Sequence, residues 1–308
     1  MPYDLREERG NAIVNKHIKI IQDLVNQIEE NVSYDVNIKS LSQSYSLSPW
    51  HFQRLFKSIV GSSLGQYTRG RRLSIAANML VETDSSILDI AVNVGFSTHE
   101  SFTRSFKDYF NYSPKDFRIE KPKVLINKKP LLTDELLEHI TTGINLEPKI
   151  VELPEQLIVG METKIPSPFV SRNKICDYVA TFWYSLFEQE RKVKNKIAHT
   201  YYALSISKSG DFTEEELTYI AGVPVSLVEN IPKEMKVYTL PKRKVAIFDI
   251  KTNIDAETAQ KTADYIYGYW IPNSKYKRGI GADYELFQNA VDFTKGDFDT
   301  SYVIPISN

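Results

Sequence analysis

The chain has 308 residues and a net charge of -1, and 42% of its residues are apolar and 25% are charged. This composition is typical of a water-soluble globular protein, and the length allows two domains with separate cores. No apolar run approaches the roughly 20 residues of a membrane span. The first ten residues, MPYDLREERG, lack the apolar stretch of a signal peptide, and the single cysteine, Cys176, excludes an internal disulfide. We therefore expect a cytoplasmic protein without membrane contact, with Cys176 in the core; the alternative for this thiol is a redox sensor.

The charge is unevenly distributed along the chain. Residues 38–118 contain ten Lys or Arg and six Asp or Glu, a net charge of +4, which leaves -5 for the rest. Such an asymmetry predicts a polyanion-binding part joined to a neutral or acidic part.

The N-terminal third has the apolar spacing of helices throughout. A helix is predicted from Ile13 to Ile28, followed by a short helix around Leu41. A longer helix is predicted from Arg69 to Val81. Asp84 or Ser85 is expected to open the next one.

Two stretches in this third are related by a constant offset of fifty residues. SPWHFQRLFKSIVGSSLGQYTR (residues 48–69) matches the stretch at residues 95–118, with Phe52 and Phe56 aligned to Phe102 and Phe106. Each predicted helix has an aromatic back and a hydrogen-bonding front. A shorter helix and a tight turn precede each, with Gly95 at the second turn, which is the helix-turn-helix arrangement.

The front residues are of types that recognise DNA. Arg suits guanine, Gln suits adenine and Thr suits either base edge, while an exposed Trp is unfavourable in water unless it contacts a partner. Further basic residues are expected to meet phosphates. One rigid helix joining two such units would present them to major-groove segments about 34 Å apart. The alternative is an ordinary solvated helix face. The candidate base contacts are Trp50, Gln53, Arg54, His99, Glu100, Thr103 and Arg104, and the candidate phosphate contacts are Lys57, Arg69, Arg71, Arg72 and Lys107.

The rest of the chain has a different character. Residues 121–146 are interrupted by prolines and lysines and are predicted to be a linker with a short helix ending at Gly143. Residues 147–308 alternate strands and helices, and a Leu-Pro turn recurs after 87 residues, at Leu153 and again at Leu240. The expected fold class is multi-domain: an N-terminal all-α domain with two helix-turn-helix subdomains and a C-terminal α+β domain built from a duplicated β-α-β-β unit around a shared cleft.

Residues 10–120 resemble the AraC/XylS family DNA-binding domain, above all its Rob/MarA/SoxS subgroup of activators. The strings SPWHFQRLFKSIVGSSLGQYTRGRRL and ILDIAVNVGFSTHESFTRSFKDYFNYSPKDFR carry this resemblance. It implies helix-turn-helix units at about residues 10–66 and 67–118, with the base contacts named above. The relatives favour two glutamines where His99 and Glu100 stand, so the second half-site is expected to differ.

Residues 147–308 resemble the GyrI-like effector-binding domain, through KVAIFDIKT, YIYGYWIPNSKYK, DYELF and YVIPI. The resemblance implies a site for bulky, often cationic apolar compounds, with aromatic walls and a buried glutamate that matches Glu285. A desolvated carboxylate among aromatic rings attracts a cation by Coulomb and cation–π interaction. Each aromatic residue alone is equally compatible with plain core packing, and Glu285 with a solvated strand. The candidate walls are Phe182, Trp183, Tyr219, Phe248, Tyr267, Trp270 and Tyr284.

The sequence thus predicts a ligand-responsive transcription activator that binds double-stranded DNA as a monomer and contacts RNA polymerase. One alternative is a constitutive DNA-binding regulator whose second domain docks a protein partner. The other is a hydrolase that uses Glu285 as a general acid or base. The five histidines lack metal-ligand spacing and no nucleophile-elbow motif occurs, so no catalytic residue, metal or cofactor is expected.

Overall fold

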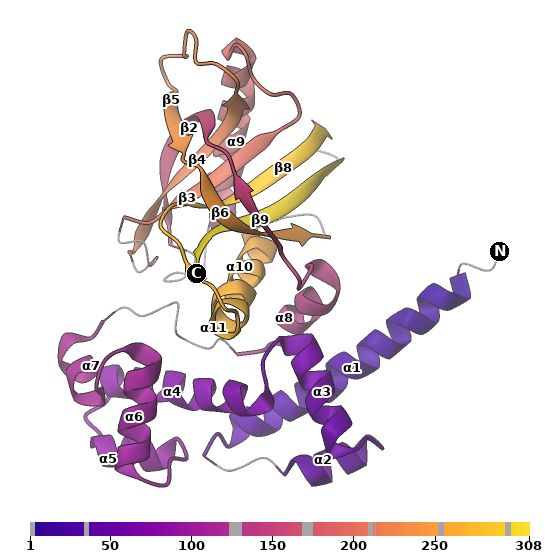
Figure 1. Ribbon diagram of the computed structural model, residues 1–308, viewed down its shortest axis with the longest axis vertical. Coiled ribbons are helices and arrows are strands. Elements are labelled where there is room, and N and C mark those ends of the chain that lie inside the picture. Colours follow the sequence, from indigo (N-terminus) through magenta and orange to yellow (C-terminus); the bar gives the residue numbers. More distant parts are fainter. Residues whose placement is uncertain are drawn as a thin grey trace. The chain divides into compact units, whose positions relative to one another are not determined.

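The structure, a computed structural model, describes residues 4–33, 37–122, 131–167, 175–208, 212, 214–251, 256–292 and 297–308. The chain divides into two compact units. Unit 1 comprises Met1–Thr142 and Asp264–Asn273, and unit 2 comprises Gly143–Ala263 and Ser274–Asn308. Unit 1 is helical and unit 2 contains an antiparallel sheet, which confirms the predicted fold class (Figure 1). The side chain of Cys176 lies outside the described residues.

Unit 1 is built from short helices around one long connecting helix, α4. Its helices are α1 (Asp4–Glu30), α2 (Ile38–Ser44), α3 (Pro49–Val60), α4 (Leu64–Glu82), α5 (Ile87–Asn93), α6 (His99–Phe110), α7 (Pro114–Glu120), α8 (Asp134–Glu138), the π-helical turns η1 (His139–Gly143) and η3 (Ile266–Trp270), and α11 (Ile271–Asn273). Both α8 and η1 lie where the sequence predicts a short helix within the linker. Ser86 caps α5, one residue after the expected Ser85.

The fifty-residue repeat is repeated in the local structure. Helices α3 and α6 begin and end at positions fifty residues apart, and Ser48 and Thr98 cap their N-termini through side-chain oxygens. Both helices end at a left-handed residue, Gly61 with φ 73° and Asn111 with φ 61°. Glycine and asparagine are the residues that adopt this conformation at least cost. The duplication therefore gives α3 and α6 the same length.

The backs of α3 and α6 form two separate cores. Phe52 and Phe56 of α3 are fully buried, as are Phe102 and Phe106 of α6. Helix α4 serves both cores, because its start places Tyr67 beneath α3 and its later turns pack in the core of α6. One continuous helix thus carries both helix-turn-helix units.

The turn before α6 requires glycine. Gly95 has φ 84°, and a Cβ there would lie 2.5 Å from the carbonyl oxygen of Ser33. Any other residue would be strained and would push against Ser33, in the turn that follows α1. This close approach ties the second helix-turn-helix unit to the turn after α1.

Unit 2 is a nine-stranded sheet among the described residues, with α9 (Ile175–Gln189) lying against β2 and β4 (Figure 1). The short 3-10 helix η2 (Glu190–Lys192) follows α9, and α10 (Ala256–Tyr265) begins in this unit. The strands are β1 (Lys149–Leu153), β2 (Gln156–Pro166), β3 (Tyr201–Ile206), β4 (Glu216–Val225), β5 (Lys236–Leu240), β6 (Arg243–Ile250), β7 (Lys277–Arg278), β8 (Asp283–Asp292) and β9 (Asp297–Ser307).

The sheet has an internal two-fold relationship. Eight of its strands follow the order β1-β6-β9-β8-β3-β4-β2-β5, and β7 pairs with β9 outside this order. Exchanging the first four strands of unit 2 with β5, β6, β8 and β9 reverses the order. The register agrees: one row across the sheet joins Phe248, Tyr302, Glu285, Ala203, Ala221 and Met161. Met161 and Phe248 in this row are 87 residues apart, the same offset as the Leu-Pro repeat. The pseudo-two-fold axis of the sheet therefore passes between Ala203 and Glu285.

Side chains on the two faces of the sheet form two apolar clusters. One face buries Val159, Ala203, Tyr219, Ala221 and Phe287, with Phe182 and Trp183 of α9 packed against it. The opposite face carries Ile158, Leu204, Ile220, Tyr284 and Val303. Because side chains alternate along each strand, Glu285 lies on the α9 face.

Candidate DNA-binding surface and effector site

The front of α3 is exposed along its whole length. Trp50, Gln53, Arg54 and Lys57 are all exposed, and Trp50 keeps 66% of its surface in solvent. The Arg54 guanidinium carbon lies 4.5 Å from the centre of the Trp50 ring. Stacking on the indole restrains Arg54 before any ligand binds, and a large exposed aromatic ring is the mark of a contact surface. The α3 front has the exposure that base reading requires.

The front of α6 is less uniform. His99, Glu100, Arg104 and Lys107 are exposed, whereas Thr103 is only partly exposed. The Thr103 hydroxyl oxygen is buried and has no hydrogen-bond partner among the described residues. Thr103 therefore presents less of its side chain to a ligand than its neighbours do.

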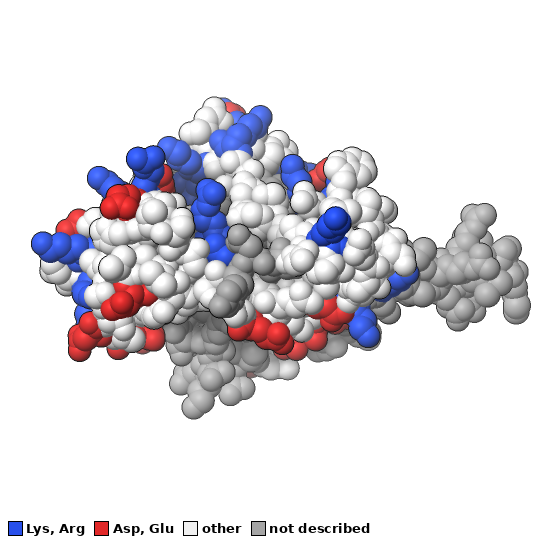
Figure 2. Space-filling view, turned by 90° about the horizontal axis from the view of Figure 1, so that it is seen from below, with Lys and Arg blue, Asp and Glu red and all other residues white. Residues whose placement is uncertain are grey.

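Charge is segregated on the face shown in Figure 2, where Lys and Arg gather along one edge and Asp and Glu along the opposite edge. Such a distribution directs one side of a surface toward a polyanion. Arg69, on α4, is exposed and keeps its predicted availability for phosphate.

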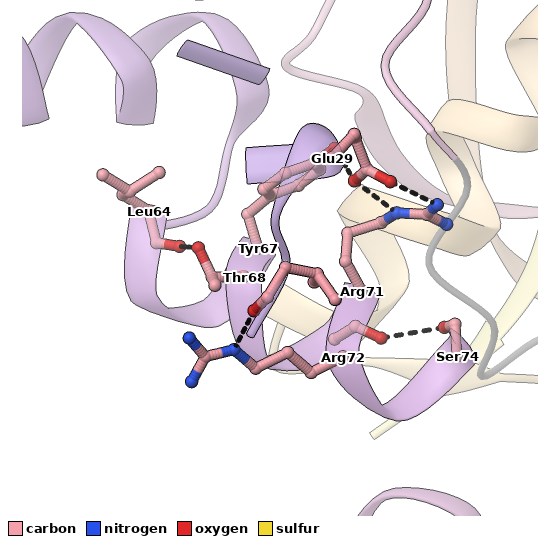
Figure 3. A network of polar contacts seen from close by, with 9 residues as sticks. Glu29, Leu64, Tyr67, Thr68, Arg71, Arg72 and Ser74 are labelled. Atoms are coloured by element: carbon pink, nitrogen blue, oxygen red, sulfur yellow. Dashed lines mark hydrogen bonds and ion pairs between the residues drawn. The ribbon is translucent and has the colours of Figure 1, made fainter. Parts of the chain in front are cut away.

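The phosphate role of Arg71 and Arg72 stays a prediction, and both side chains already have protein partners (Figure 3). Arg71 makes two hydrogen bonds to the Glu29 carboxylate, each 2.8 Å long. Arg72 donates to the carbonyl oxygens of Val32, at 2.7 Å, and of Gly95, at 3.1 Å. Arg71 and Arg72 thus hold α4 against the end of α1 and the second turn. These contacts favour a structural role in setting how the two helix-turn-helix units are oriented.

Glu285 occupies the centre of the sheet on the face that α9 covers. Its cross-strand neighbours are Ala203 on β3 and Tyr302 on β9. Desolvation by burial raises the pKa of its carboxyl to about 7, although the residue keeps some accessible surface. No hydrogen bond to the carboxyl is found among the described residues. A shielded carboxylate without a partner ion is unfavourable unless a ligand supplies the opposite charge.

Four of the predicted aromatic walls share the Glu285 face. Trp183 of α9 donates a hydrogen bond of 2.9 Å to the Tyr219 hydroxyl, and the rings of Phe182 and Tyr219 lie 6.1 Å apart. Burial raises the pKa of Tyr219, and the nearby Glu285 charge raises it further. Phe248 reaches this face through its pairing with Tyr302. The arrangement brings a carboxylate and large aromatic rings to one face.

Among the other three predicted walls, only Tyr284 is placed relative to Glu285 by the sheet itself. Tyr284 is next to Glu285 in sequence and points to the opposite face, where it packs against Tyr202 with ring centres 5.5 Å apart. Tyr267 and Trp270 lie in Asp264–Asn273, which is part of unit 1. The prediction of Tyr284 as a wall beside Glu285 is therefore wrong, because side chains alternate along β8, whereas the role of Tyr267 and Trp270 stays a prediction.

Sequence reasoning missed the residues that flank Glu285 across the sheet, Ala203 and Tyr302. Strand pairing between segments distant in sequence brings them together, so no local pattern identifies them.

The described residues contain no group of three or more His, Cys, Asp or Glu side chains placed to hold a metal ion. None of their helices combines the length and the apolar character that crossing a membrane needs.

The fold and both sites define a DNA-binding regulator with an attached small-molecule-binding domain. A helix-turn-helix domain family matches residues 41–119, and the GyrI-like small molecule binding domain family matches residues 146–307. The chain belongs to the AraC/XylS family of transcription regulators and carries a GyrI-like C-terminal domain. These matches are to a regulator and a binding domain, not to an enzyme.

Curated relatives match the N-terminal part. The chain is 38% identical over 102 residues to the regulatory protein SoxS of Escherichia coli (strain K12), covering 33% of this chain and 95% of the relative. It is 43% identical over 101 residues to the probable transcription factor PqrA of Proteus vulgaris, covering 32% and 83%. The multiple antibiotic resistance protein MarA of Salmonella typhimurium is 37% identical over 99 residues, covering 32% and 78%.

Solved structures resemble each part separately. An AraC-type DNA-binding regulator from Chromobacterium violaceum aligns with a TM-score of 0.32 and 25% identity, covering 33% of this chain and 92% of that one. The structure of SAV2435 bound to tetraphenylphosphonium aligns with a TM-score of 0.42 and 17% identity, covering 53% and 95%.

Proposed function

We propose that the protein is a transcription activator that reads an asymmetric DNA site as a monomer through α3 and α6. The observation that carries this proposal is the duplicated, exposed front of the two helices on one chain. The fronts differ in composition, with Trp50, Gln53 and Arg54 on α3 against His99, Glu100 and Arg104 on α6. Two different readers in one chain favour two different half-sites and remove the need for a second copy.

Random-site selection with the purified full-length protein tests the DNA part. We expect an asymmetric site with two half-sites about one helical turn apart. Selection of a palindrome, or no enrichment over random DNA, would contradict the proposal. Sedimentation of the complex on the selected site is expected to give one protein per duplex.

For the second domain, we propose an apolar, cationic effector bound at Glu285. The support is a carboxylate with a pKa raised to about 7 by burial, on the same face as the rings of Trp183 and Tyr219. Cation–π attraction and the carboxylate charge both favour a lipophilic cation over a neutral molecule of the same shape.

A thermal-shift titration with tetraphenylphosphonium, an aryl cation, tests the effector part. We expect a concentration-dependent rise in melting temperature that Glu285→Gln removes and that Glu155→Gln, at an exposed position, retains. A neutral tetraphenyl analogue is the matched ligand control. Stabilisation by neither compound, with DNA binding intact, would favour the alternative of a domain that docks a protein partner.

We further propose contact with RNA polymerase, because an activator must recruit or remodel the enzyme. In vitro transcription from a template carrying the selected site tests this directly. We expect more transcript on adding the protein, and an effect of the cation only if the cation binds the active and inactive states with different affinity. Repression on every placement of the site would contradict the activator role.

A further inference from the structure

The segment 264–273 is part of unit 1, although the chain on both sides of it belongs to unit 2. It contains the π-helical turn η3 (Ile266–Trp270), and the residues from Tyr265 to Tyr269 are all buried. Such turns are uncommon and occur mostly at positions with a function. The segment is therefore a place where the C-terminal half of the chain enters the helical unit.

Aromatic rings connect this segment to the first reading helix. Tyr265 and Tyr269 stack with ring centres 6.4 Å apart and an interplanar angle of 13°. Tyr269 stacks on Tyr67 of α4 at 6.4 Å and 12°, and Tyr67 meets Phe56 of α3 edge-on at 5.6 Å. Phe56 lies on the back of the helix whose front carries Arg54. The four rings form a column from η3 to the base of α3, which we call the tyrosine column.

Polar contacts fix the middle of the tyrosine column. The Tyr67 hydroxyl donates to the Glu29 carboxylate at 3.2 Å, and the same carboxylate accepts both hydrogen bonds from Arg71 (Figure 3). Burial raises the pKa of Tyr269 well above its ordinary value, and the nearby Tyr67 is the next cause. The Tyr67 ring is therefore held between the Tyr269 ring and the Glu29 carboxylate, which is itself ion-paired with Arg71, and has little freedom to shift alone.

The second helix-turn-helix unit supplies an internal comparison. Fifty residues after Phe56 and Tyr67 stand Phe106 and Phe117, whose rings also meet edge-on, at 5.2 Å. Phe117 lacks the hydroxyl of Tyr67, and the further rings around it, Phe110 and Tyr112, come from its own unit. Among the described residues of its apolar cluster, none lies outside positions 73–117. The ring of Tyr269 stacks on Tyr67, which belongs to the first helix-turn-helix unit.

We infer that Tyr269 and Tyr67 are positioning residues for α3, and that residues 264–273 act on the first half of the DNA site and not on the second. The insertion of Tyr269 into the tyrosine column sets where α3 rests on α4, and with it the placement of Trp50 and Arg54. The consequence for DNA depends on the proposed function. The positioning of α3 does not.

Hydrogen–deuterium exchange on the full-length protein tests the positioning without DNA or effector. Tyr269→Ala is expected to raise exchange in α3 by about tenfold and to leave α6 unchanged, because local opening affects the residues whose packing is lost. Tyr269→Phe keeps the ring and is expected to restore protection. Tyr184→Ala, at a residue with 67% exposure, is the matched control. Unchanged exchange in α3 would overturn the inference, and so would equal increases in α3 and α6, which indicate general destabilisation.

DNA binding supplies the second arm. On the selected site, Tyr269→Ala is expected to reduce discrimination against base changes in the half-site that α3 reads and to leave the other half-site as in the wild type. Equal effects on both half-sites would overturn the inference. If the wild type binds no DNA specifically, the proposed function fails while the exchange experiment still decides the positioning of α3.

Discussion

The pair formed by Arg71 and Glu29 gives the sharpest single prediction. Their side chains keep 15% and 19% of their surface, and two hydrogen bonds of 2.8 Å join them. Removing one partner of a fully buried pair costs about 3–5 kcal/mol, whereas an exposed pair contributes about 0–1 kcal/mol. With most of both side chains covered, we expect Arg71→Ala to lower the free energy of unfolding by ~2–4 kcal/mol.

Urea unfolding followed by far-UV circular dichroism measures this loss, since the helices of unit 1 contribute strongly to that signal. Glu29→Ala should cost a similar amount, and the double variant less than the sum of the two, because neither charge is then left unpaired. The matched control is Arg69→Ala, two positions away on α4 and exposed. It should change stability by less than about 0.5 kcal/mol and lower the salt slope of DNA binding by about one. Arg71→Ala with wild-type stability and a reduced salt slope would refute the structural role.

Three further predictions concern the two sites. Arg54→Ala and Arg104→Ala should each weaken specific DNA binding by ~1–3 kcal/mol, measured by fluorescence anisotropy, and equal losses on random DNA would rule out base reading. Because burial raises the Glu285 pKa from its ordinary value of 4.5 to about 7, tetraphenylphosphonium binding should strengthen as pH rises from below to above about 7. The sign is opposite for stability: the free protein loses stability, by at most ~3 kcal/mol, as pH rises from about 4.5 to about 7, and the loss is complete above that. Glu285→Gln should flatten both profiles, and a profile unchanged by the substitution would exclude Glu285 as the titrating group. Tyr284→Phe, on the opposite face, should leave the affinity for the cation within about twofold of wild type, whereas Tyr219→Phe should weaken it. Calorimetry measures both affinities. A larger loss in Tyr284→Phe than in Tyr219→Phe would place the ligand on the other face.

Sequence alone determined the features that depend on local spacing. The amphipathic period, the capping residues and the offset of fifty predict two like helices with buried Phe52 and Phe102 and exposed Arg54 and Arg104, and the structure has them so. Strand alternation is equally local, and along β8 it requires that the adjacent residues Tyr284 and Glu285 face opposite sides of the sheet.

Tertiary structure decided which residues distant in sequence each side chain contacts. Helical periodicity places Arg69, Arg71 and Arg72 around α4 but does not say which side of α4 another segment covers. Glu29 and Val32, at and just after the end of α1, bind Arg71 and Arg72. Likewise, the apolar content around Tyr267 is compatible with burial but does not give its location, and the chain buries residues 265–269 in unit 1. The physical reason is common to both: a side chain's direction follows from its own backbone, whereas its partner comes from a segment distant in sequence, brought near by the packing of the whole fold.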